Sequence, residues 1–372
     1  MAALMLLGGG SATALAADTP DGRSPVVIVN KGDNSKIAGR DLVNGNDNTT
    51  GSGHTVTRTS PSPSPSPSPS PSPTPTPTTP AQLVAWYQTG TTTGDSTPYV
   101  SPAPLAGHAS VVEVAAVHLN NPAQFPILTL NSDIPSSPKY APMWRDLDAL
   151  KSKGVTVTAL LGGAETDTRP GTFQLLDSDF NMYYPPIRDF LRTYDLDGID
   201  LDIEETFTEA TAERLIRQLR TDFGADFLIT LAPVPGDLTD APGSNLPNID
   251  YRTLEANVGS SINWYNVQFY CGNGSLADTS DYDQIIQNGF PASKVAAGAI
   301  TWQTSECPGY VPMPTLQNTL RSLATKYPGF RGAAGWEYAP STDVNAPNCP
   351  TGPANWYCAV QQALPATTTS NP

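Results

Sequence analysis

Three acidic side chains stand two residues apart in one short apolar segment: Asp200, Asp202 and Glu204. Alternate side chains of a β-strand point to the same face. We therefore expect the three carboxyl groups on one face and the apolar Leu201 and Ile203 on the other. Burial and like charge both oppose ionisation, so at least one carboxyl group should keep a proton near neutral pH. Glu204, the last of the three, is the candidate general acid.

An acidic segment of this kind could also be a solvent-exposed strand or a calcium-binding loop. An exposed strand would not carry a continuous apolar face, as Ile199, Leu201 and Ile203 provide here. A calcium loop of the EF-hand type needs a turn with a central glycine, which the apolar residues do not suit. The spacing from Asp197 to Glu204 would arise by chance in a chain of this composition with a probability of roughly a few in a thousand. We therefore interpret the segment as a functional site.

The elements that must position these carboxyl groups lie within residues 81–365, where β-rich apolar runs alternate with helical patterns. Eight runs are expected as strands: 83–87, 111–117, 155–161, 198–203, 227–232, 262–270, 295–301 and 332–336. A helix is expected over 314–327, with its proline at the start. Alternation implies parallel strands joined by crossovers, and eight units in this length indicate an α/β fold, the (β/α)8 TIM barrel. A doubly wound sheet would usually show a glycine-rich phosphate loop after the first strand, and none follows Tyr87.

Other segments flank the expected barrel. Residues 1–17 are apolar and end in small residues, which is typical of a secretory signal peptide, although the first basic residue is Arg23. Residues 18–58 are polar and expected to be disordered. Residues 59–80 alternate Ser or Thr with Pro, which predicts an extended polyproline linker of roughly 60 Å. Residues 366–372 are a C-terminal tail.

Charge and composition limit the possible partners. The net charge is −15, and because residues 1–80 carry equal numbers of basic and acidic side chains, all of it lies in the expected barrel and tail. Nucleic acid and anionic membranes need basic patches, so we expect neither as a partner. With 3 His and 4 Cys in no metal-ligand spacing, neither a metal nor another cofactor is expected.

The four cysteines suggest disulfides in a secreted protein. Three pairings are possible, and we favour Cys271 with Cys307 and Cys349 with Cys358. Cys271 and Cys307 follow neighbouring strands of the expected barrel, so their loops share a rim. Cys349 and Cys358 lie close together in the sequence.

The segment from Asp197 to Glu204, Asp-Gly-Ile-Asp-Leu-Asp-Ile-Glu, resembles the DGxDxDxE signature of glycoside hydrolase family 18. This family includes chitinases and endo-β-N-acetylglucosaminidases. Residues 160–163 (Leu-Leu-Gly-Gly) are similar to its Ser-x-Gly-Gly motif, with Leu160 in place of serine. Two further segments are similar to motifs of this family and occur in the same order along the chain: Gln-Phe-Tyr at 268–270 and Gly-Trp at 335–336. The resemblance covers about residues 81–345.

The resemblance implies a substrate-assisted mechanism. By position, Glu204 would protonate the glycosidic oxygen and later activate water. Asp202 would orient the 2-acetamido group of the sugar and stabilise an oxazolinium ion. Asp200 would share a proton with Asp202, and Tyr270 would donate a hydrogen bond to the acetamido carbonyl.

Further residues are expected to bind substrate. The resemblance implies that Trp336 stacks beneath the sugar, although plain barrel packing is an alternative. Gln268 shares the face of Tyr270, and the motif of the third strand adds two more substrate-binding residues, Gly162 and Gly163. Asp197 and Glu205 are out of phase with the three carboxyl groups, so we expect structural or solvated roles for them.

The implied function is that of a secreted chitinase that acts outside the cell or at the cell wall, expected to be a monomer. An endo-β-N-acetylglucosaminidase that cuts the chitobiose core of N-glycans is the main alternative. The stretch 264–270 (Trp-Tyr-Asn-Val-Gln-Phe-Tyr) and the pair Glu204-Glu205 resemble some fungal enzymes of that kind. A non-catalytic chitin-binding lectin on the same barrel is a third possibility, but such relatives usually lack the acid at the position of Glu204.

Overall fold

The computed structural model describes residues 81–88, 99–164, 170–239 and 247–365. The signal peptide, polar segment and linker expected within residues 1–80, and the tail expected at 366–372, lie outside the described residues. Within these ranges, no helix is both long and apolar enough to cross a membrane.

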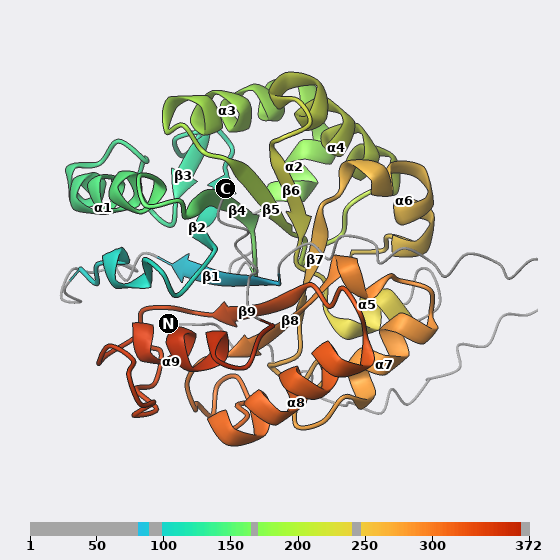
Figure 1. Cartoon of the computed structure of the whole chain (residues 1–372). Coiled ribbons are helices and arrows are strands. Elements are labelled where there is room, and N and C mark those ends of the chain that lie inside the picture. Colours follow the sequence, from blue (N-terminus) through green and yellow to red (C-terminus); the bar gives the residue numbers. More distant parts are fainter. Residues whose placement is uncertain (1–80, 89–98, 165–169, 240–246, 366–372) are drawn as a thin grey trace, which may run out of the picture. The chain divides into compact units, whose positions relative to one another are not determined.

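Parallel strands close into a barrel (Figure 1). The sheet runs in the order β1-β9-β8-β7-β6-β5-β4-β2, and pairing of β1 with β2 completes the ring. The strands are β1 (Gln82–Gln88), β2 (Val111–Leu119), β4 (Thr156–Gly162), β5 (Gly198–Asp202), β6 (Leu228–Leu231), β7 (Trp264–Gln268), β8 (Val295–Ile300) and β9 (Gly332–Trp336). Each expected run overlaps one of them, so the (β/α)8 fold is confirmed. A doubly wound sheet is excluded, because its two edge strands would not pair with each other.

Two details differ from the expected strands. Strand β7 is shorter than the run 262–270, because its pairing with β6 begins at Trp264 and its pairing with β8 ends at Gln268. A short strand, β3 (Leu128–Leu130), was not expected and lies antiparallel to the end of β2. Three residues are too few to show a strand periodicity in the sequence.

Helices and helical turns surround the barrel (Figure 1). The α-helices are α1 (Ala141–Lys151), α2 (Thr172–Ser178), α3 (Phe180–Thr193), α4 (Glu209–Phe223), α5 (Pro235–Thr239), α6 (Tyr251–Val258), α7 (Ser280–Gln287), α8 (Met313–Lys326) and α9 (Ala354–Gln361). The 3-10 turns are η1 (Ala103–Leu105), η2 (Pro138–Tyr140), η3 (Gly259–Ser261) and η4 (Ala292–Lys294). The helix expected at 314–327 is α8.

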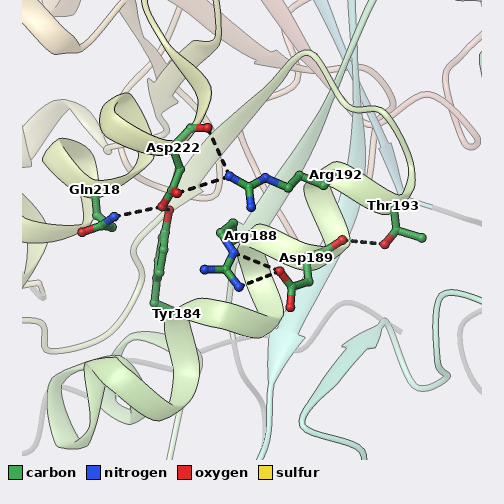
Figure 2. A network of polar contacts seen from close by, with 7 residues as sticks. All are labelled: Tyr184, Arg188, Asp189, Arg192, Thr193, Gln218 and Asp222. Atoms are coloured by element: carbon green, nitrogen blue, oxygen red, sulfur yellow. Dashed lines mark hydrogen bonds and ion pairs between the residues drawn. The ribbon is translucent and has the colours of Figure 1, made fainter.

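A polar network ties α3 to α4, the helices before and after β5 (Figure 2). Asp222 of α4 accepts hydrogen bonds from Tyr184 Oη at 2.7 Å and Gln218 Nε2 at 2.9 Å, and it pairs with Arg192 at 3.3 Å. The hydrogen bonds from Gln218 and Tyr184 lower the pKa of Asp222. The network thus holds together the two helices that flank the acidic strand.

The apolar side chains of the strands form two separate clusters. One lies between strands and helices and contains Ile199, Leu201 and Ile203, as the alternation along β5 predicted. The other contains the opposite-facing residues and fills the inside of the barrel; its members include Val84, Trp86, Val111, Leu160, Trp264, Tyr270, Ile300 and Ala334. The polar side chains of β5 that face this interior must be paired with other polar groups to be stable there.

The two disulfides pair as favoured from the sequence, Cys271 with Cys307 and Cys349 with Cys358. The first joins the segment after β7 to the segment after β8, at the carboxyl end of the barrel. The second joins α9 to the loop that precedes it. Active sites of TIM barrels lie at the carboxyl end of the strands, so the first disulfide borders that face.

Candidate active site

The three acidic side chains of the sequence motif lie in a column from the barrel interior to its rim. Asp200 and Asp202 on β5 are 0% and 6% exposed, and Glu204 just beyond the strand is half-buried. Strand alternation aims all three toward the barrel axis. The structure therefore brings together the carboxyl groups that the motif selected, with Glu204 at the end nearest the rim.

Asp202 and Glu204 form the upper part of this column. One amide connects their carboxyl groups: Gln268 Nε2 donates to Asp202 Oδ1 at 2.9 Å and lies 3.4 Å from Glu204 Oε1. A direct hydrogen bond between the two carboxyl groups needs a proton on one of them. Burial raises the pKa of both carboxyl groups, and the charges of Glu204 and Asp200 raise that of Asp202 further. Glu204 thus has a raised pKa, as a general acid near neutral pH requires.

Asp200 occupies the lower part of the column and is surrounded by donors. Thr230 Oγ1 donates to its Oδ1 at 2.5 Å, and Asn266 Nδ2 lies 3.3 Å from the same atom. The Trp86 indole Nε1 lies 3.3 Å from its Oδ2. Burial raises the pKa of Asp200, while these hydrogen bonds act in the opposite direction.

None of these three donors was assigned to the site from the sequence. Period-two alternation counted back from Tyr270 and Gln268 along β7 reaches Asn266, so the strand pattern held a usable signal. Leu160, which replaces the serine of the family motif, is the neighbour of Asp200 in the β4–β5 ladder and offers no donor. The hydrogen bonds to Asp200 therefore come from other strands.

A fourth carboxyl group, that of Glu113 on β2, was also missed. It is 0% exposed and faces the barrel interior. Asn266 Nδ2 lies 3.2 Å from its Oε1, so one amide bridges Glu113 and Asp200. The sequence signal was a single acidic residue within an apolar β-rich run.

Aromatic rings border the column. The Trp86 ring meets Tyr270 edge-on at 6.4 Å between centroids and Trp336 at 6.1 Å. Burial, followed by the charges of Asp202 and Glu204, raises the pKa of the Tyr270 hydroxyl, which therefore stays protonated and able to donate. Trp302 and Tyr310, from the segment after β8, pack half-buried against the same interior cluster and were not expected from the sequence.

The glycine pair ending β4 supports the backbone of Asp202. Gly162 and Gly163 have φ of +95° and +92°, and Gly163 N donates to Asp202 O at 2.8 Å. A Cβ on Gly162 would lie 2.4 Å from the same carbonyl oxygen. These glycines thus allow β4 to approach Asp202 closely.

The two out-of-phase acids have structural contacts. Asp197 Oδ2 accepts from Val157 N at 2.9 Å, and its Oδ1 pairs with Lys151 at 3.1 Å. Glu205 Oε1 accepts from Phe173 N at 2.7 Å, at the start of α2.

In the part of the chain that the structure describes, no group of three or more His, Cys, Asp or Glu side chains could hold a metal ion. The buried Asp202–Glu204 pair, with its raised pKa values, is suited to acid–base chemistry.

A TIM barrel with a column of carboxyl groups at the carboxyl ends of its strands, bordered by aromatic rings, is the architecture of a glycoside hydrolase. Residues 85–306 match the model of glycosyl hydrolases family 18. This chain belongs to glycoside hydrolase family 18.

The similar proteins include an endo-β-N-acetylglucosaminidase and chitinases. A fungal endo-β-N-acetylglucosaminidase of family 18 is 38% identical, with a TM-score of 0.67, over 76% of this chain and 98% of its own. The chitinase ChiC from Aspergillus fumigatus is 37% identical, with a TM-score of 0.64, over 70% and 93%. Chitinase 2 from Rhizopus oligosporus is 27% identical over 261 residues, 62% of this chain, and the chain spans 44% of that protein.

Proposed function

We propose that this protein is a secreted glycoside hydrolase that cleaves β-1,4 linkages of N-acetylglucosamine polymers, most simply chitin, with retention of configuration. The buried Asp202–Glu204 pair, bridged by Gln268, carries this proposal. It supplies a carboxylic acid with a raised pKa and, beside it, a second carboxyl group that can contact the 2-acetamido group of the sugar. Residues 81–365 are the catalytic domain in this proposal.

In the first step, Glu204 gives its proton to the glycosidic oxygen as the bond from that oxygen to the anomeric carbon breaks. The carbonyl oxygen of the substrate's 2-acetamido group attacks the anomeric carbon from the opposite face and forms an oxazolinium ion. The Glu204 carboxylate then takes a proton from water, whose oxygen attacks the same carbon and opens the oxazolinium ring. Two inversions at this carbon give net retention.

The neighbouring side chains stabilise the charge that develops. Asp202 accepts a hydrogen bond from the acetamido N–H, and its negative charge offsets that of the oxazolinium ion. Tyr270, whose raised pKa keeps it protonated, donates to the acetamido carbonyl oxygen. Trp336, half-buried at the end of β9, stacks against the sugar, and Gln268, Gly162 and Gly163 hold the substrate and Asp202 in place.

The test is Glu204→Gln, which keeps the shape but removes the transferable proton. We expect kcat to fall about 10³-fold or more on chitin oligomers. Glu205→Gln is the matched control, because the neighbouring acid accepts a backbone N–H at the start of α2 and should keep most activity. Full activity of Glu204→Gln would contradict the mechanism. Binding of chitin oligomers by wild type, without turnover of any N-acetylglucosamine substrate, would instead favour the lectin.

Endo-β-N-acetylglucosaminidase activity is the second candidate function. It is favoured by the 38% identity to a fungal enzyme with that activity, although a chitinase is 37% identical. Mass spectrometry of products from chitin oligomers and from a high-mannose glycoprotein, incubated side by side with this protein, separates the two. Release of a glycan that leaves one N-acetylglucosamine on the protein identifies the endoglycosidase.

Secretion is supported by the two disulfides, since such bonds form and persist in oxidising compartments. With the signal-like segment at 1–17, they favour an extracellular or cell-wall location. Export of the protein with an amino terminus near residue 18 would support this location. Retention in the cytoplasm with free thiols would contradict it.

A further inference from the structure

Glu113 lies below the column of carboxyl groups that the proposed mechanism uses. In the strand ladders Glu113 pairs with Thr158, which pairs with Gly198, so Glu113 starts two residues below Asp200 on the neighbouring side of the barrel. Its side chain reaches up to Asp200, because one amide nitrogen, Asn266 Nδ2, lies 3.2 Å from Glu113 Oε1 and 3.3 Å from Asp200 Oδ1. Burial, then the charge of Asp200 and hydrogen bonding to it, raise the pKa of Glu113, and two ionised carboxylates could not hydrogen-bond because neither has a proton to donate.

The hydrogen bonds of Glu113 indicate which of the two carries the proton. Its Oε1 accepts from Asn266, but its buried Oε2 has no partner at hydrogen-bond distance and angle in the described structure. The Trp86 indole is a nearby donor, but its lowering of the pKa of Glu113 is the smallest of the effects and is outweighed by burial and Asp200. Asp200, in contrast, has donors at both oxygens, from Thr230, Asn266 and Trp86. A proton on Glu113 that is donated to Asp200 satisfies the otherwise unpaired oxygen.

The surroundings of Glu113 contain no compensating positive charge. The interior-facing neighbours are neutral: Trp86 on β1, Thr158 on β4, Thr230 on β6, Asn266 on β7, Ala296 on β8 and Ala334 on β9. Asp200 is the adjacent titratable group, with Asp202, Glu204 and Tyr270 above it. Among the described residues no Lys, Arg or His hydrogen-bonds or ion-pairs with Glu113, and the Arg331 guanidinium stacks on Trp264 instead. An ionised Glu113 would therefore be an unpaired buried charge, which is strongly unfavourable.

We propose that Glu113 is a positioning residue that stays protonated and donates its proton in a hydrogen bond to Asp200, which keeps Asp200 ionised. An ionised Asp200 disfavours two further negative charges on the pair above it, so Asp202 and Glu204 keep the one proton that they share and that Glu204 transfers to the substrate. Leu160 leaves the adjacent position on β4 without a donor, and Glu113 supplies one from β2. This inference rests on the proposed function.

Two substitutions of similar size test the proposal. Glu113→Gln keeps a neutral N–H donor toward Asp200, whereas Glu113→Met fills the space without a donor. We expect Glu113→Gln to keep kcat/KM within about threefold and to leave the pH profile unchanged. Loss of the donor in Glu113→Met raises the pKa of Asp200, so the acidic limb of kcat/KM should move up by about one pH unit.

Two outcomes would overturn the proposal. If Glu113→Gln shifts the acidic limb as far as Glu113→Met, Glu113 acts as a charged group. If neither substitution moves the profile, Glu113 only fills space. Wild-type activity is measured first, so inactivity of the wild type would count against the proposed function and not against the role of Glu113.

If the Glu113→Met protein does not fold, a second measurement, which needs neither that protein nor turnover, tests the proposal. The infrared spectrum of wild type minus Glu113→Gln at neutral pH should contain the carbonyl stretch of one protonated carboxylic acid. A carboxylate band in its place would show that Glu113 is ionised and would contradict the proposal.

Discussion

Asp200, Asp202 and Glu204 differ in the donors that surround them, although they share one strand face. Asp200 is contacted by three side-chain donors, from β1, β6 and β7. Asp202 and Glu204 share Gln268 and hydrogen-bond to each other. Hydrogen bonds from donors favour the charged form of a carboxyl group. Asp200, which has the most donors, is therefore the group that most readily carries a negative charge, whereas Asp202 and Glu204 more readily carry a proton.

At the residue scale, Tyr270→Phe tests the hydroxyl that faces the column. The ring should still pack edge-on against Trp86, so we expect an unchanged Tm but a fall in kcat of about 10²-fold, since the hydrogen bond that orients the acetamido carbonyl oxygen for attack is lost. Tyr338→Phe is the control, because its hydroxyl donates to Ser101 O outside the barrel. Equal activity of the two variants would remove Tyr270 from the mechanism.

At the element scale, the end of β4 is fixed by its closeness to β5. Gly162→Ala would place a Cβ 2.4 Å from both Asp202 O and a ring carbon of Phe173, so β4 or Asp202 must shift. We expect loss of kcat of at least about tenfold and a lower Tm.

Gly154→Ala is the matched control for Gly162→Ala. Gly154 has φ of +83°, but a Cβ there would have no neighbour within 4 Å. It therefore carries the same backbone strain, about 1–2 kcal/mol, without the clash. Equal activity of Gly162→Ala and Gly154→Ala would show that the contact with Asp202 is unimportant.

The Cys271–Cys307 disulfide is a second feature at the element scale. Cys271 directly follows Tyr270, and Cys271 N donates to Pro308 O at 2.7 Å, so the segment after β8 holds the end of β7. We expect Cys271→Ala/Cys307→Ala to lower stability by up to about 4 kcal/mol and also to lower kcat.

The Cys349→Ala/Cys358→Ala protein is the control for this disulfide. That disulfide closes a shorter loop next to α9, and its removal should cost about 3 kcal/mol with kcat at low temperature unchanged. Denaturant unfolding and initial rates measure both effects. A loss of kcat that is the same for both pairs would contradict a role in placing Tyr270.

At the scale of the whole molecule, the barrel is closed by elements distant in sequence. β1 pairs with β9 and with β2, and Tyr357 of α9 donates its hydroxyl to Gly335 O at 2.9 Å on β9. Among the described residues, both disulfides and the strand pairings lie within residues 82–361, inside the proposed catalytic domain.

A protein that begins at residue 81 tests this domain boundary. We expect it to fold with the same Tm as the full chain and to keep kcat on soluble oligomers, because the linker and the segments before it are outside the proposed domain. Circular dichroism melting and initial rates provide the comparison. A large loss of Tm would place part of the core before residue 81.

Much of the fold could be predicted because its signals are local. Period-two and helical patterns located the strands and α8, and the alternation along β5 predicted a shared face for Asp200, Asp202 and Glu204. The loops after adjacent parallel strands meet at one rim, which is why the pairing of Cys271 with Cys307 was also accessible. These properties depend on residues close in sequence or on neighbouring strands.

The partners of Asp200 could not be predicted in the same way. Trp86, Glu113, Thr230 and Asn266 come from four strands, and each is one of several residues that face the interior. Which of them reach Asp200 depends on the stagger of the strands around the closed barrel. The sequence by itself determined that carboxyl groups would be stacked on β5. The tertiary structure decided what surrounds each one and, through burial and hydrogen bonding, the favoured location of each proton.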